Sequence, residues 1–183
     1  MTDYFALFDQ PRAPWLDSAA LKEIFHRKTL EEHPDTAGPG SENRFAALNE
    51  AYQVLQDPKR RLQHLLELEG AVPSRASQTI PNELEELFLR IGERNQRARR
   101  LLEQIHGAST VLERSLLKPQ VLEVQKAIED LRHQVRNLDE DANRELKEID
   151  AKQIDAISQL HSRFAYLGRW SAQLDELAFQ LSL

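Results

Sequence analysis

The stretch that decides the fold is residues 121–142, which read VLEVQKAIEDLRHQVRNLDEDA. Apolar residues recur in it at alternating steps of three and four, the spacing that places side chains on one face of an α-helix. They are Val121, Val124, Ile128, Leu131, Val135, Leu138 and Ala142. Polar residues fill most of the positions between them. The stretch therefore predicts a long amphipathic helix with a heptad seam.

A second seam of the same kind follows, formed by Ile157, Leu160, Phe164, Leu167, Trp170, Leu174, Leu177 and Leu181. Heptad seams pack at shallow crossing angles, so we expect the two helices to form an antiparallel hairpin. The acidic stretch Asp139–Asp141, with Asn143, is the expected reversal, and we expect a minor break at Pro119. A dimeric coiled coil remains the alternative to a bundle closed within one chain.

A third long helix is predicted to start around Pro81, because proline at the first helical position loses no intrahelical hydrogen bond. Its broad apolar stripe consists of Leu84, Leu87, Phe88, Ile91, Ala98, Leu101 and Ile105. With the two seams it predicts an antiparallel three-helix bundle over residues 79–183. We expect the protein to be a monomer, with the coiled-coil dimer still open.

The residues before this bundle predict a small helical domain at 1–71 and a linker at 72–78, within the stretch rich in Pro, Gly, Ser and Thr from Gly70 to Pro81. Four helices are expected in the domain. They run from Tyr4 to Phe8, from Asp17 or Ser18 to Glu32, from Ser41 to Asp57, and through Leu62, Leu65 and Leu66 to Gly70. Period-two alternation is missing from the sequence, so the expected fold class is all-α.

Composition excludes several functions. The 183 residues include no cysteine, so a disulfide framework, a cysteine-ligated zinc and a cysteine nucleophile are excluded. A formal charge of −6 opposes binding to nucleic acid and to anionic membranes. No histidine pair has metal-ligand spacing, and neither a phosphate loop nor a nucleophile elbow occurs. We therefore expect no catalytic residues, metal or cofactor, and a cytoplasmic protein without a leader or membrane span.

The tripeptide His33-Pro34-Asp35 is the most informative motif. It follows an amphipathic helix of about 15 residues and precedes RFAALNEAYQVL at 44–55, then Asp57-Pro58 and the basic run KRR at 59–61. In a purely structural interpretation, Pro34 ends the helix and the side chain of Asp35 hydrogen-bonds to the backbone of its own turn. The flanking helices favour a functional one.

This constellation resembles the J domain, the DnaJ-type module that stimulates ATP hydrolysis by DnaK-type heat-shock ATPases. The resemblance runs from Tyr4 to about Gly70. It implies that His33, Pro34 and Asp35 contact a DnaK/HscA-type ATPase, and that Lys22, Arg27 and Lys28 give the second helix a positive docking face. Asp35 on a proline-stiffened turn suits a charge-assisted bond to a partner arginine.

The sequence departs from the usual J-domain pattern next to the tripeptide. Glu31, Glu32 and Thr36 stand where that pattern has basic or aromatic residues, and Lys28 stands where it prefers leucine. Acids within the positive face weaken its field, so we expect docking that is weak or specialised for one ATPase.

Three further segments resemble the HscB type of J protein, which delivers the scaffold protein IscU to its chaperone during iron-sulfur cluster assembly. They are DYFALF at 3–8, RLQHLLEL at 61–68 followed by Gly70, and YLGRW at 166–170. The resemblance implies that an IscU-type scaffold binds the bundle. A J protein with another client, and a coiled-coil interaction protein with a degenerate J domain, are the alternatives.

The positions that match the family's client-binding face are Leu84, Leu87, Phe88, Ile91 and Tyr166. Phe88 falls where the family usually has glutamate. Leu84, Leu87 and Ile91 also have the spacing of core residues, so packing inside the bundle is an equally good interpretation of them. Phe88 lies at the edge of the stripe and is the best candidate for an exposed anchor.

Overall fold

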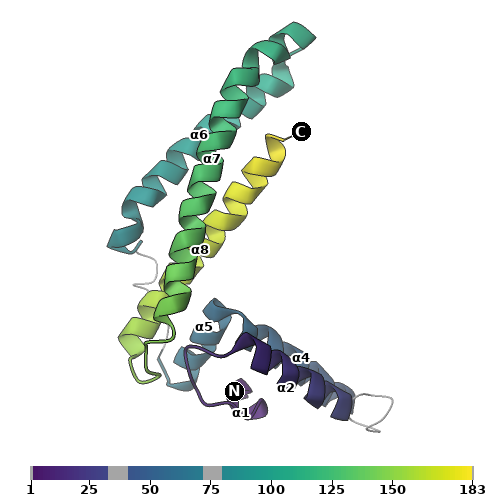
Figure 1. Cartoon of the computed structure of the whole chain (residues 1–183), viewed down its shortest axis with the longest axis vertical. Helices are drawn as coiled ribbons and strands as arrows, with labels where there is room; N and C mark the ends of the chain where they lie inside the picture. The colour runs from purple at the N-terminus through teal and green to yellow at the C-terminus, as the bar shows by residue number, and fades with distance from the viewer. Residues whose placement is uncertain (1, 33–40, 72–79, 183) are drawn as a thin grey trace. The chain divides into compact units, whose positions relative to one another are not determined.

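The computed structural model describes residues 2–32, 41–71 and 80–182, and in these ranges the chain is helical and contains no β-strand (Figure 1). The predicted all-α class is confirmed. The helices are α1 (Tyr4–Leu7), α2 (Ser18–Glu31), α4 (Ser41–Gln56), α5 (Pro58–Leu68), the 3-10 turn η2 (Asn82–Leu84), α6 (Glu85–Gly107), α7 (Val111–Glu145) and α8 (Ile154–Gln180).

The chain divides into two compact units. One comprises Met1–Gln78 with Asn143–Phe164, and the other comprises Thr79–Ala142 with Ala165–Leu183. The first unit thus includes the end of the α7–α8 hairpin where the chain reverses. The predicted boundaries at 1–71, 72–78 and 79–183 follow chain order instead and stay a prediction.

Aspartate residues cap the starts of α1, α2 and α5. The Oδ1 of Asp17 accepts hydrogen bonds from the backbone N–H groups of Ala19 and Ala20 at 2.9 Å, and so starts α2 where the sequence predicted. The Oδ1 of Asp57 accepts from the N–H of Arg60 at 2.8 Å, with Pro58 at the first position of α5. These caps satisfy N–H groups that a helix start otherwise leaves without partners.

Buried apolar side chains from all four N-terminal helices form the core of the first unit: Phe5, Phe8, Leu21, Leu48, Ala51, Leu55, Leu62, Leu65 and Leu66. The buried guanidinium of Arg61 donates from Nε to the carbonyl of Pro14 at 2.7 Å and from Nη1 to the carbonyl of Leu55. Burial lowers the pKa of Arg61 to about 10. Arg61 therefore ties the segment before α2 to the end of α4, as a structural and not a binding residue.

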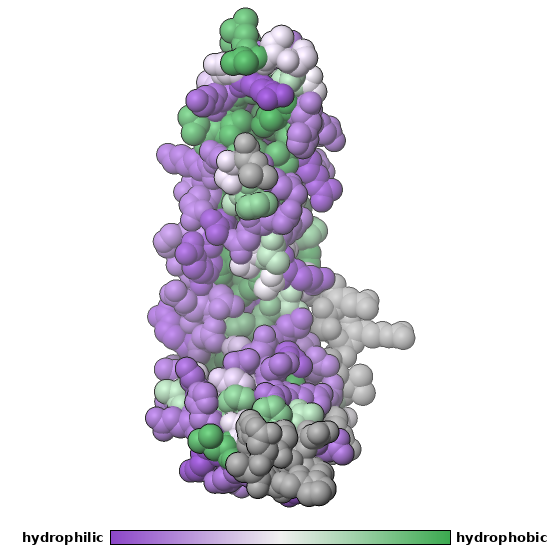
Figure 2. Space-filling view, turned by 90° about the vertical axis from the view of Figure 1, so that its right-hand side faces the viewer, coloured by the Kyte–Doolittle hydropathy of each residue, from purple (hydrophilic) through white to green (hydrophobic). Residues whose placement is uncertain are grey.

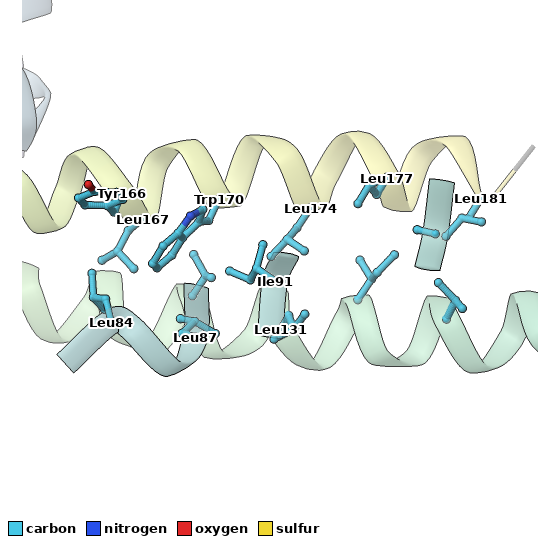
Figure 3. Packing of buried hydrophobic residues seen from close by; sticks show 14 of the residues in the cluster. Leu84, Leu87, Ile91, Leu131, Tyr166, Leu167, Trp170, Leu174, Leu177 and Leu181 are labelled. Carbon is cyan, nitrogen blue, oxygen red and sulfur yellow. The ribbon is translucent and has the colours of Figure 1, made fainter. Parts of the chain in front are cut away.

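The core of the second unit lies between α6, α7 and α8, as expected for a three-helix bundle (Figure 3). Leu84, Leu87 and Ile91 come from the η2–α6 segment, and they meet the buried seam of α7. The α8 side of the core consists of Tyr166, Leu167, Trp170, Leu174, Leu177 and Leu181. Both heptad seams are thus buried within one chain, and a second copy is not needed to cover them.

The predicted reversal at Asp139–Asp141 is wrong. These residues lie inside α7, which continues to Glu145, and the chain reverses over residues 146–153. Ala142 and Leu146 are both buried and extend the apolar stripe past the acidic residues. Apolar spacing therefore outweighs the local turn preference of the acidic run.

The predicted break at Pro119 is also wrong, because α7 runs through this residue. Proline removes one N–H donor, which leaves the carbonyl four residues earlier, at Ser115, without its intrahelical partner. Both Ser115 and Pro119 are exposed, so this carbonyl lies on the solvent side, where water can bind it.

Candidate functional sites

The predicted tripeptide His33-Pro34-Asp35 lies outside the described residues, but the two helices that flank it are well defined. The rings of Phe25 in α2 and Tyr52 in α4 stack at 4.2 Å, with an interplanar angle of 13°. Arg44 at the start of α4 forms an ion pair of 3.3 Å with Glu32, which caps the end of α2. Late residues of α2 thus pair with early residues of α4, so the two helices form an antiparallel hairpin.

The three predicted cations of α2 are in different environments. Lys22 and Arg27 are exposed, as is the neighbouring His26. The ammonium of Lys28 instead forms an ion pair of 2.7 Å with Asp9 and lowers the pKa of that carboxyl. The cations available on α2 are therefore Lys22 and Arg27, and Lys28 is a partly buried internal partner.

Sequence reasoning missed the role of Asp9. Its backbone has a φ of 52°, in the left-handed region, directly after α1. Aspartate enters this region more readily than most residues, and here the turn brings its carboxylate to Lys28. Only the cluster Phe8-Asp9-Gln10-Pro11 after a short apolar helix gave a signal, and it indicated a turn without a partner.

The two acids before the tripeptide also differ. Glu32 pairs with Arg44 inside the hairpin, whereas Glu31 is exposed. The charge of Glu32 is therefore partly compensated before any partner binds. Glu31 is the acid that remains next to the positive residues of α2.

Four of the five predicted client-binding residues are core residues. The exposed fractions of Leu84, Leu87, Ile91 and Tyr166 are 0%, 7%, 2% and 8%. The core-packing interpretation is correct for Leu84 of η2 and for Leu87 and Ile91 of α6, and Tyr166 joins the same core (Figure 3). The expectation that these four side chains form an exposed face has to be corrected, because the helices opposite them already cover them.

Phe88 is the exception, because 44% of it is exposed. Its ring lies 6.4 Å from that of Trp170, and Trp170 in turn lies 5.6 Å from the ring of Tyr166. Phe88 and Tyr166, which the sequence placed in one site, are thus linked through a buried tryptophan that the sequence assigned only to the seam. The guanidinium of Arg169 covers the Tyr166 ring at 4.6 Å.

The surface around Phe88 combines apolar and acidic side chains. Leu89 is 63% exposed, and Glu85 and Glu86 in the first turn of α6 are exposed as well. An exposed aromatic ring supported from below by packed aromatic residues is a typical anchor of a protein interface. We call Phe88, Leu89, Glu85 and Glu86 the Phe88 surface.

Other kinds of site were sought within the ranges that the structure describes. No group of three or more His, Cys, Asp or Glu side chains there has the arrangement to hold a metal ion. None of the helices in those ranges has both the length and the apolar character needed to span a membrane.

Comparison with known sequences identifies the N-terminal part. A model of the DnaJ domain matches residues 12–64. The chain is 51% identical over 41 residues to chaperone protein DnaJ 1 of Cutibacterium acnes, a match that covers 22% of this chain and 10% of that protein. It is 35% identical over 85 residues to the co-chaperone protein HscB homolog of Vibrio cholerae serotype O1, a match that covers 43% of this chain and 50% of that protein. These matches span half or less of the relatives' own length.

Comparison with solved structures extends the likeness to almost the whole chain. Chaperone HscB from Vibrio cholerae superposes with a TM-score of 0.56, covering 98% of this chain and 99% of that one at 20% identity. Human co-chaperone protein HscB gives a TM-score of 0.52 at 19% identity, and the superposition covers 96% of this chain and 82% of the human one. At these identities the structures share the fold, with N-terminal short helices followed by a helical bundle.

Proposed function

We propose that this chain, whose residues 12–64 match the DnaJ domain and whose fold resembles that of HscB, acts as a co-chaperone that stimulates a DnaK/HscA-type ATPase and delivers a client to it. One observation carries the proposal: His33-Pro34-Asp35 joins α2 to α4 inside the stretch that matches the DnaJ domain. The proposed location is the cytoplasm, with which a chain without cysteine is compatible.

In the proposed mechanism, the α2–α4 hairpin presents the tripeptide on a rigid support. The Phe25–Tyr52 stack and the Glu32–Arg44 ion pair hold the two helices together before the partner arrives. This support and the fixed φ of Pro34 lower the entropy lost on docking. The carboxylate of Asp35 accepts charge-assisted hydrogen bonds from an arginine of the ATPase.

The exposed cations of α2 contribute long-range attraction. Lys22 and Arg27 face solvent, so they raise the rate of encounter with an acidic surface on the ATPase. Lys28 contributes less because Asp9 neutralises it. This small positive face supports our proposal that docking is weak or selective for one ATPase.

The bundle is the proposed client-binding part, and the Phe88 surface is the proposed contact. The client we propose is an IscU-type scaffold. Its binding would place client and ATPase on one molecule and so raise the effective concentration of client at the chaperone. Leu84, Leu87, Ile91 and Tyr166 then act indirectly, because they hold α6 and Phe88 in position from inside the core.

The ATPase proposal is tested by single-turnover ATP hydrolysis, using the full chain and each DnaK-type ATPase of the source organism. We expect the wild-type chain to accelerate hydrolysis by one of them and His33→Gln to abolish the acceleration. His133→Gln is the matched control, since His133 is exposed on α7 outside the hairpin. Full stimulation by His33→Gln contradicts the proposal, and no stimulation by the wild-type chain favours a degenerate J domain.

The client proposal is tested separately by calorimetry with the IscU-type scaffold of the same organism. We expect Phe88→Ala to weaken binding about tenfold, the loss typical of an exposed aromatic anchor. Phe179→Ala, which removes another exposed ring from α8, should leave the affinity unchanged. If the wild-type chain stimulates the ATPase but does not bind the scaffold, the client is another protein.

A further inference from the structure

Among the helices of the described ranges, α6 and α7 alone reach the end of the bundle at the α6–α7 turn. The third helix, α8, stops at Gln180, while α6 and α7 continue beyond it to their turn (Figure 1). Gln125 of α7 marks the level at which α8 ends, because its Nε2 donates to the carbonyl of Leu181 at 2.8 Å. The first three turns of α7, before Val121, therefore have no third helix beside them.

This two-helix end exposes much apolar surface. The exposed fractions of Val111, Leu112, Leu116 and Leu122 are 87%, 71%, 68% and 63%. Hydrophobic side chains are visible at the same end in Figure 2. With the half-buried Leu117 and Val121, they make the start of α7 apolar around most of its circumference. A helix with this pattern is normally covered on more than one side.

The register of the helices identifies the side that a third helix would cover. Gln125 lies on the α8 side of α7, and Val121, Lys118 and Arg114 lie one, two and three turns before it on that side. Phe88 lies on the α8 side of α6, and Arg99, Leu102 and His106 follow it by three, four and five turns. We define the distal face as Arg99, Leu102 and His106 of α6 with Arg114, Leu117, Lys118 and Val121 of α7.

The distal face has an apolar floor and a basic rim. Leu102, Leu117 and Val121 are half-buried against the core, whereas Arg99, His106, Arg114 and Lys118 are exposed. The apolar side chains of this face thus pack toward the core, and the charged side chains border them. Such a surface fits the apolar side of one more helix.

Charge indicates which helix fits. Residues 94–122 contain six Arg and Lys against two Glu, on a chain whose total charge is −6. One of the six, Arg97, is paired with Glu123 at 2.7 Å, which leaves five cations against two acids. One of the two acids, Glu113, is occupied as a cap, since it accepts from the N–H groups of Ser109 and Thr110. The other, Glu103, is exposed one turn after Arg99, so it is an acid next to the four basic residues Arg99, His106, Arg114 and Lys118. The rim therefore favours an acidic partner.

We propose that the distal face docks an acidic amphipathic helix of a partner protein, about three turns long, in line with α8. A second copy of this end is disfavoured because both copies carry the same positive charge. An anionic lipid surface is flat and would touch the charged rim while burying less of the half-buried Leu102, Leu117 and Val121 than a helix does. The site lies beyond the Phe88 surface along α6, and it stands whether or not the proposed co-chaperone function is correct.

The test uses the full chain and a fluorescent synthetic peptide of about 12 residues, with Leu at helical spacing and Glu elsewhere. We expect Arg99→Glu with Lys118→Glu to weaken its binding by about tenfold or more. Arg100→Glu with Lys126→Glu makes the same charge change at exposed positions outside the distal face, so its effect should stay below about twofold. All four positions are exposed, and circular dichroism should confirm unchanged folding.

Five results would overturn the proposal. The acidic peptide does not bind the wild-type chain, or a peptide with Lys in place of Glu binds equally well. Both double variants weaken binding to the same extent. Light scattering shows a dimer that Arg99→Glu with Lys118→Glu dissociates. Vesicles of phosphatidylglycerol and phosphatidylcholine, and not the peptide, bind in a way that depends on these two cations.

Discussion

The α2–α4 hairpin and the α6–α8 bundle relate sequence to function in different ways. In the hairpin, a few chemically specific residues stand at fixed places, among them the tripeptide at 33–35 and Asp17, which caps α2. In the bundle, the recurring feature is the spacing of apolar residues, which many sequences satisfy equally well. The first region can therefore be matched by sequence, whereas the second is recognised chiefly by its fold.

The largest effect expected of a single substitution is a loss of stability in the bundle. Leu87 and Phe88 are neighbours, but Leu87 is buried and Phe88 is half-exposed. Leu87→Ala should lower the free energy of unfolding by about 3 kcal/mol, because it leaves a cavity in the core. Phe88→Ala should lower it by less than about 1 kcal/mol. Urea denaturation measures both, and equal losses would contradict the assignment of Phe88 to the surface.

In the hairpin, by contrast, charge changes should affect docking and spare stability. Lys22→Glu with Arg27→Glu should weaken docking on the ATPase by about tenfold at low salt and less at high salt. The urea midpoint should not move, since both side chains are exposed. Arg100→Glu with Lys126→Glu is again the control of equal charge. An equal loss with the control pair would mean that net charge alone governs docking.

A smaller effect is expected from pH, through two buried histidines of the first unit. His161 is 9% exposed, its two ring nitrogens have no hydrogen-bond partner, and burial lowers its pKa. Burial also lowers the pKa of His64, whose Nε2 accepts the N–H of Tyr4 at 3.1 Å. Both histidines thus bind a proton more readily in the unfolded chain than in the folded one. Their contribution to the free energy of unfolding is fully present above about pH 6.5 and is lost as the pH falls below that value.

Urea unfolding at neutral and acidic pH measures this loss. The groups of α5 that act on His161 are Lys59, which also lowers its pKa, and Glu67, which raises it. His161→Leu should therefore reduce the pH dependence, and the exposed His133→Leu should not change it. If the free energy of unfolding depends on pH as steeply in His161→Leu as in the wild-type chain, His161 is not the group whose titration causes the loss.

Long apolar periodicity predicted the three bundle helices, Asp17 predicted the start of α2, and Pro58 predicted the end of α4. The errors arose where a local preference competes with packing, at Asp139–Asp141 and at Pro119. The sequence placed Phe88 at the edge of the apolar stripe but did not show that Leu84, Leu87, Ile91 and Tyr166 are buried, because an apolar stripe does not tell how much of it the other helices cover. The Asp9–Lys28 pair depends on an unusual backbone turn, which the sequence alone does not specify.

The most direct test of the account is whether the two regions act on one event. Single-turnover hydrolysis by the DnaK-type ATPase would be measured with the chain, with a subsaturating IscU-type scaffold, and with both together. The account predicts that the two together accelerate hydrolysis by more than the sum of their separate effects, and that Phe88→Ala removes this excess. A purely additive rate with the wild-type chain would contradict it.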